Sequence, residues 1–184
     1  MQRRPRIRLA PALFFLVSAA CAAHADETGT AIGERIPRFT SGDFDSHATE
    51  RPTAYLFLGN GCPATRAYAD RIRALDGAYA GKVDFVYLYP NKTDKAADKR
   101  AHHKALGVKG LFIDDEQARI AKLVGAARTT EVLVVDKHGT IVYRGAIDDS
   151  KDAPAKVRRR HVAVALDEIL AGKKVTTPKT DVFA

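Results

Sequence analysis

The sequence predicts an α/β fold in which helices cover both faces of a mixed β-sheet. Two apolar runs, 53–59 and 82–89, have the length and composition of buried strands, and each leads into a segment of helical composition. Two further strands, 131–136 and 141–144, are separated by a tight turn and predict an antiparallel hairpin. Two strand–helix units that lead into a hairpin give this mixed sheet.

Three elements surround the first two strands. Residues 36–44 contain a proline and a glycine and favour a short edge strand or hairpin, because proline is confined to sheet edges. A helix over 93–106 is expected, with Thr93 or Asp94 as its cap. A longer helix is expected over 64–80, because large residues recur there at helical spacing: Tyr68, Ile72, Leu75 and Tyr79.

The carboxyl-terminal half adds shorter elements around the hairpin. Residues 107–112 are interpreted as a connection to a short helix over 116–123. A closing helix is expected over 156–170, where apolar residues fall on one side. The tail, 173–184, is predicted to be irregular.

Residues 1–25 have the pattern of a secretory signal peptide. Four arginines precede an apolar run, 9–17, and small residues follow that end in Ala23-His24-Ala25. The apolar run is too short to span a bilayer as a mature helix. We therefore expect a periplasmic or secreted protein with no stable membrane insertion after the leader is removed.

The expected mature chain has three parts. A polar linker, 26–35, precedes one globular domain, 36–172, and the tail follows. An alternative is a lipoprotein with Cys21 acylated, although the serine at position 18 is a poor match to such sites.

Charge argues against a nucleic-acid partner. The formal net charge of +8 falls by four when the leader's four arginines are removed. The basic run over 156–161 has no interleaved aromatic residues for base stacking. We interpret it as the solvated face of a helix.

The number of cysteines limits the thiol chemistry that the chain can carry out. Of the two cysteines, Cys21 leaves with the predicted leader and Cys62 remains. An intramolecular disulfide is then excluded. A single thiol in an oxidising compartment is either buried and inert or reactive toward something outside its own chain.

The position of Cys62 favours the reactive interpretation. It lies between a predicted strand and a predicted helix, where free backbone N–H groups and the helix dipole favour an anion. Pro63 suits a first helical position. The hydroxyl of Thr65 can turn toward the sulfur, and Arg66 adds a cation. These features favour the thiolate, which is the nucleophile; the alternative is a buried cysteine that acts as a small apolar residue.

Two motifs stand out in the chain. The first is Cys62-Pro63-x-Thr65 at a helix start, followed by a strand ending in Tyr-Pro. The second is the segment 125–149, GAARTTEVLVVDKHGTIVYRGAIDD. Together they resemble the motifs of exported redoxins of the thioredoxin superfamily, the group near thiol–disulfide reductases and thiol-specific antioxidant (peroxiredoxin) proteins. The resemblance covers roughly residues 32–170 and implies a thioredoxin-like fold with Cys62 as the attacking thiol.

The chain departs from both mechanisms of these relatives. Reductases carry a second cysteine where this chain has Thr65, and their cis-proline corresponds to Thr130. Because a cis bond before a non-proline residue costs roughly 3 kcal/mol, we expect a trans bond and a shifted loop there. Peroxiredoxins carry a threonine where this chain has Gly59, and their later arginine has only an offset candidate in Arg128.

The resemblance also implies roles for two residues near the thiol. Glu131 would lie beside Cys62 and accept a proton, or it is only a solvated acid at a strand start. The N–H and hydroxyl of Thr130 are expected to point toward the sulfur and crowd the approach of a polypeptide, which would favour small oxidants over protein disulfides.

No metal and no other cofactor are expected. His47, His102 and His103 invite a metal interpretation, but copper(I) prefers more than one thiolate. Adjacent helical histidines also point about 100° apart.

Two functional hypotheses come first. As an enzyme, Cys62 reduces a small oxidant to give a sulfenic acid, or exchanges with a protein disulfide, and an external thiol regenerates it. As a binding module, the domain has lost turnover and uses the same surface to hold a partner. A copper carrier is a third, weaker possibility.

Overall fold

The computed structural model describes residues 30–151 and 154–183. Within these residues, one sheet has the strand order β5-β4-β3-β6-β7. β3, β4 and β5 are parallel, whereas β6 runs antiparallel to both of its neighbours. The strands are β3 (Thr53–Phe57), β4 (Asp84–Leu88), β5 (Leu111–Ile113), β6 (Val132–Val135) and β7 (Ile141–Gly145). The mixed sheet predicted from the sequence is confirmed.

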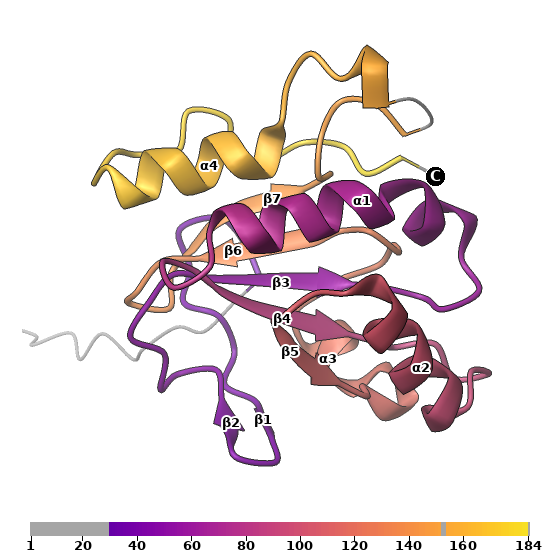
Figure 1. Cartoon of the computed structure of the whole chain (residues 1–184). Helices are drawn as coiled ribbons and strands as arrows, with labels where there is room; N and C mark the ends of the chain where they lie inside the picture. The colour runs from indigo at the N-terminus through magenta and orange to yellow at the C-terminus, as the bar shows by residue number, and fades with distance from the viewer. Residues whose placement is uncertain (1–29, 152–153, 184) are drawn as a thin grey trace, which may run out of the picture.

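Helices cover both faces of this sheet (Figure 1). The helices are α1 (Pro63–Ala78), α2 (Ala96–Leu106), α3 (Arg119–Leu123) and α4 (His161–Leu170). One apolar cluster joins the sheet to α1, α4 and the end of α2, and a second joins its other face to α3 and the segment around Phe39. The prediction of helices on both faces is therefore confirmed.

β3 shows why the sequence forms a central strand. All five of its residues are buried, and successive side chains alternate between the two apolar clusters. Ala54 and Leu56 face α1, whereas Tyr55 and Phe57 face α3. A strand that is covered on both faces reads as a continuous apolar run, which is why it could be predicted.

Several predicted boundaries differ from the structure. The hairpin expected over 36–44 is formed by β1 (Thr40–Ser41) and β2 (Phe44–Asp45). The helix expected from Thr93 begins at Ala96, with Lys95 as its N-cap, and α4 begins at His161 rather than at 156. A 3₁₀ turn, η2 (Pro154–Lys156), precedes α4.

Residues 107–112, interpreted as a connection, contain the start of a fifth strand. β5 pairs only with β4, along three residues. So short an edge strand gives too few residues for an alternating pattern to be recognised. The short helix expected over 116–123 is divided between a 3₁₀ turn, η1 (Glu116–Ala118), and α3.

Both ends of the described chain are held by the β6–β7 hairpin. In the predicted linker, the N–H of Gly33 donates to the carbonyl of Ile141 at 2.8 Å. Residues 173–183 of the tail form no helix, and Thr180 packs on β7, where its N–H donates to the carbonyl of Arg144 at 3.1 Å. A Cβ on Gly145 would lie 2.6 Å from the Thr180 carbonyl oxygen, so only glycine fits this approach.

The predicted leader, 1–25, and the first linker residues, 26–29, lie outside the described residues. None of the helices in the described part of the chain has the length and apolar character needed to cross a membrane.

Candidate active site

Cys62 occupies the turn that joins β3 to α1. It is the N-cap of α1, with an extended backbone at φ −79° and ψ 124°, and Pro63 is the first helical residue. Its own N–H donates to the carbonyl of Gly59 at 3.2 Å, which closes the turn. The side chain is half-buried, so the sulfur stands where the free N–H groups of the helix begin and where solvent still reaches it.

Two threonines and the first N–H groups of α1 shift the ionisation of the Cys62 thiol. Burial disfavours the thiolate, but hydrogen bonds from the N–H of Thr65, the Thr129 hydroxyl, the N–H of Ala64 and the Thr65 hydroxyl outweigh it. The pKa of Cys62 therefore lies below the ordinary value of a cysteine. The site favours the nucleophilic form of the thiol.

Thr65 is held so that its hydroxyl can donate a hydrogen bond to the sulfur. The side chain is fully buried, and its Oγ1 accepts the N–H of Gly59 at 3.3 Å. Because that bond uses the oxygen as an acceptor, the hydroxyl proton stays available for Cys62. The role of Thr65 in the reactivity of Cys62 stays a prediction.

Thr129 is the site residue that sequence reasoning missed. It lies in the loop between α3 and β6, opposite the β3–α1 turn, and its hydroxyl is among the groups that lower the pKa of Cys62. A Cβ on Gly59 would lie 3.3 Å from the Cys62 Cβ and 3.7 Å from the Thr129 Cγ2. The absence of a side chain at Gly59 thus lets the loop approach the thiol closely.

Thr130 does not have the orientation expected for it. Its N–H donates to the carbonyl of Phe57 at 2.7 Å, and its hydroxyl donates to the carbonyl of Thr129 at 2.6 Å. The preceding peptide bond is trans, as expected, but the residue has φ +66°, which side chains rarely adopt. Both donors are therefore used within the loop, and it is the neighbouring Thr129 that faces the sulfur.

Glu131 fits neither interpretation of its role. The side chain is 6% exposed, so it is not a solvated acid. Its carboxylate accepts the N–H groups of Ala127 at 3.0 Å and Arg128 at 3.3 Å, and lies 3.8 Å from the Arg144 guanidinium. Glu131 thus holds the loop that carries Thr129 and is not among the residues that line the cavity beside Cys62.

The two candidate arginines are both exposed but differ in position. Arg66 lies on the outer side of α1 and is not among the groups that shift the Cys62 pKa. Arg128 lines the cavity that opens beside the thiol. Only Arg128 is placed to contact a molecule in that cavity.

The cavity beside Cys62 has a volume of about 450 Å³. Small residues form much of its wall, together with Pro90 and Asn91 after β4. The small residues are Gly59, Gly61, Ala118, Ala121, Ala126 and Ala127. The thiolate therefore faces a space larger than a peroxide requires.

The family model described as Redoxin matches residues 32–159, a range that includes Cys62, Thr129 and the cavity. This chain belongs to the Redoxin family. Its family and fold are those of thiol-oxidoreductase-like proteins. No curated protein sequence matches the chain closely enough to count as a relative.

Solved structures agree with the thioredoxin-like fold. An uncharacterised conserved protein from Geobacillus kaustophilus is 24% identical, with a TM-score of 0.74 over 83% of this chain and 89% of that one. A hypothetical protein from Sinorhizobium meliloti has the same identity and TM-score, over 83% and 91%. A secreted disulfide oxidoreductase from Mycobacterium tuberculosis is 13% identical, with a TM-score of 0.51 over 65% and 82%.

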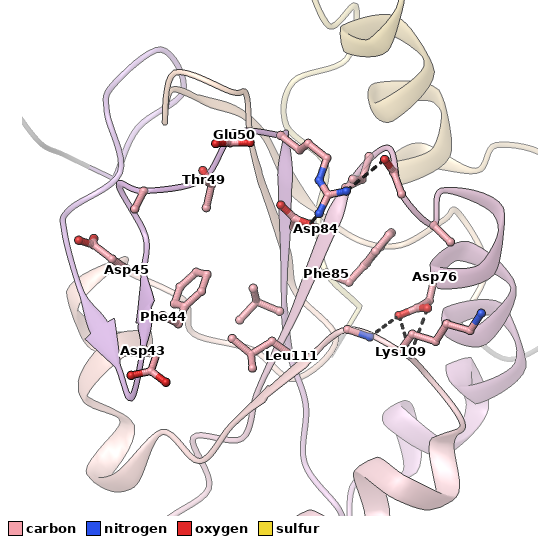
Figure 2. Close-up of a pocket in the computed structure, with 17 residues that line it drawn as sticks. Asp43, Phe44, Asp45, Thr49, Glu50, Asp76, Asp84, Phe85, Lys109 and Leu111 are labelled. Atoms are coloured by element: carbon pink, nitrogen blue, oxygen red, sulfur yellow. Dashed lines mark hydrogen bonds and ion pairs between the residues drawn. The ribbon is translucent and has the colours of Figure 1, made fainter.

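A second cavity, of about 770 Å³, lies at the opposite end of the sheet (Figure 2). Acidic side chains surround it, but the buried Asp76 already accepts N–H groups of Lys109 and Gly110, and Asp84 pairs with Arg51 at 2.6 Å. No group of three or more His, Cys, Asp or Glu side chains in the described residues is placed to hold a metal ion.

Proposed function

We propose that this Redoxin-family protein is a thiol-dependent oxidoreductase in which the Cys62 thiolate reduces a small oxidant. The position of the half-buried Cys62 at the N-cap of α1, where helix-start N–H groups and the Thr65 hydroxyl are placed as donors to the sulfur, carries this proposal, and the lowered pKa of the thiol supports it. A structural cysteine needs no such donors, whereas a nucleophilic one needs its thiolate stabilised. The adjoining cavity supplies access to the sulfur.

The chemistry needs an external thiol. When the thiolate attacks a hydroperoxide, an S–O bond forms, the O–O bond breaks, and the leaving oxygen takes a proton, which gives an alcohol or water and a Cys62 sulfenic acid. A thiol then displaces water to form a mixed disulfide, and a second thiol releases Cys62 and a small disulfide. The same thiolate can open a disulfide by exchange.

Intact-mass measurement after one equivalent of peroxide, with a sulfenic-acid trap present, tests the proposal. We expect one trapped adduct in the parent and none at this site in Cys62→Ser, which also separates Cys62 from Cys21. Repeated turnover should follow when excess thiol is added. A thiol that stays untouched would instead favour a binding module that uses the same surface.

We also propose that the protein is exported. The arginine-rich leader and its Ala23-His24-Ala25 ending support a mature start near Asp26. Sequencing the amino terminus of protein purified from its native host tests this. A terminus at a lipid-modified Cys21 would replace the soluble form with an anchored one.

A further inference from the structure

In the loop over 126–131, most backbone N–H groups already have hydrogen-bond partners within the protein. The N–H groups of Ala127 and Arg128 donate to the Glu131 carboxylate, and the N–H of Thr130 donates to Phe57. The carbonyl of Thr129 accepts the Thr130 hydroxyl at 2.6 Å. A polypeptide that binds as an added strand needs free backbone groups along an edge. Most N–H groups on this side of the cavity are already used within the protein.

The cavity itself has the dimensions of a small-molecule site. Its 450 Å³ lies within the range of roughly 300–1,000 Å³ that is usual for ligand pockets. Because six of its lining residues are glycine or alanine, the wall next to Cys62 leaves room for a molecule larger than a peroxide. The occupant must therefore be recognised by its shape and by a few polar contacts.

The charge on the cavity lining is positive. Among the described residues that line it, Arg128 is the one charged side chain, and none carries a carboxylate. Arg128 is exposed, and its position on the lining lets the guanidinium meet an anion on a bound molecule. Arginine binds a carboxylate, like a phosphate, through two parallel hydrogen bonds.

We propose that this cavity binds a low-molecular-weight thiol that carries a carboxylate, and that such a thiol, rather than a polypeptide, reduces oxidised Cys62. The inference rests on the proposed function, because it names the reductant of the same site. The thiol sulfur attacks the Cys62 sulfenic sulfur, an S–S bond forms and water leaves. A second molecule of the thiol then attacks the mixed disulfide, which yields the small disulfide and the free Cys62 thiol.

Two thiols that differ in charge test the role of Arg128. Oxidised protein is mixed with glutathione, which carries carboxylates, or with uncharged 2-mercaptoethanol, and the rate of Cys62 reduction is measured. In Arg128→Glu we expect the rate with glutathione to fall about tenfold, as for loss of a charge-assisted contact, while the rate with 2-mercaptoethanol falls by much less. Lys122→Glu, an exposed charge reversal on α3 outside the cavity lining, should leave both rates unchanged.

A third reductant tests the exclusion of polypeptides. An extended peptide with one central cysteine should reduce Cys62 on the order of a hundredfold more slowly than glutathione, because it cannot pair with the loop. Equal rates for peptide and glutathione would overturn the inference. So would an equal effect of Arg128→Glu on both small thiols.

Exchange with small disulfides separates this inference from the proposed function. The reaction of reduced Cys62 with glutathione disulfide, compared with 2-hydroxyethyl disulfide, needs no sulfenic acid. If peroxide gives no sulfenic acid, the proposed function fails, but an Arg128-dependent preference for glutathione disulfide would still support the cavity's selectivity. Absence of that preference would overturn it.

Discussion

The two ends of the central sheet each border a cavity, and they use their polar groups in opposite ways. At the end where β4 and β5 begin, the 4%-exposed Asp76 accepts two backbone N–H groups (Figure 2). It also accepts the Tyr87 hydroxyl. At the end where β3 stops, donors from α1 and the Thr129 loop converge on the sulfur of Cys62. The first set joins elements of the fold to each other, whereas the second surrounds an atom that can gain or lose a proton.

This difference shows that the larger cavity is not the better functional candidate. Three of the carboxylates that line this cavity have partners within the fold. Asp45 pairs with Arg38 in the hairpin segment, Asp84 pairs with Arg51 at the strand starts, and Asp76 joins α1 to the start of β5. The donors at Cys62 come from α1 and from the Thr129 loop, and the group that they surround is a thiol. Their effect falls on the ionisation of a thiol, and this is a chemical rather than a structural role.

Asp76→Ala should produce the largest effect and fall on stability alone. It leaves the N–H groups of Lys109 and Gly110 and the Tyr87 hydroxyl without their buried acceptor, so we expect a loss of about 3 to 5 kcal/mol in unfolding free energy. Urea denaturation measures this. Asp70→Ala, an exposed acid on the same helix, should change stability by less than about 0.5 kcal/mol.

Asp76→Ala also tests whether the two ends of the sheet act independently. Folded Asp76→Ala should react with a thiol reagent at the parental rate, because no contact joins Asp76 to the Cys62 site. If its thiol reactivity falls while the protein is still folded, the two ends are coupled and the separation of roles is wrong.

Thr130→Pro should also destabilise the protein, in the loop that carries Thr129. Proline requires φ near −65° and has no N–H, whereas Thr130 has φ +66° and donates to Phe57. We expect a loss of about 3 kcal/mol in a denaturant titration. A parental stability would show that the loop readily adopts the conformation of the proline-containing relatives.

Thr129→Val tests the chemical role of the Cys62 end of the sheet. It keeps the shape of the side chain but removes a donor to the thiolate, so the pKa of Cys62 should rise. At neutral pH the rate of alkylation should fall about tenfold, the size of one hydrogen bond to a charged group. Unfolding free energy should change little. A parental rate would remove Thr129 from the site.

The smallest expected effect concerns Asp45, at the rim of the Figure 2 cavity. A hydrogen bond from Arg38, with a second from the N–H of His47, lowers the pKa of Asp45 to about 2. A lowered pKa contributes stability above the unfolded value, near 4, and that contribution is lost as the pH falls toward about 2. Arg38→Ala should flatten this part of the acid denaturation curve, and an unchanged curve would show that the pair is not formed in solution.

The sequence predicted the elements whose burial leaves a strong pattern. β3, β4, α1 and the β6–β7 hairpin were expected because their apolar periodicity reflects the two sides of the core. β5 was missed because three residues at a sheet edge carry too little pattern. The start of α4 was misplaced because basic residues of helical composition precede it.

At the site, local position was predictable and cross-chain contact was not. Strand–turn–helix order placed Cys62, Pro63 and Thr65 together, since the three are close in sequence. The choice between Thr129 and Thr130 depends on one positive φ, which a threonine gives no reason to expect. The role of Glu131 depends on two backbone N–H groups of its own loop.

Titration of the Cys62 thiolate tests the central claim most directly. Thiolate absorbance is followed against pH in the native and the urea-unfolded protein, and the spectrum of Cys62→Ser is subtracted so that Cys21 cancels. Because hydrogen bonds to the sulfur outweigh its burial, the native midpoint should lie below the unfolded one. The parent should accordingly gain stability over Cys62→Ser as the pH rises past the native midpoint. A native midpoint equal to or above the unfolded one would contradict the account.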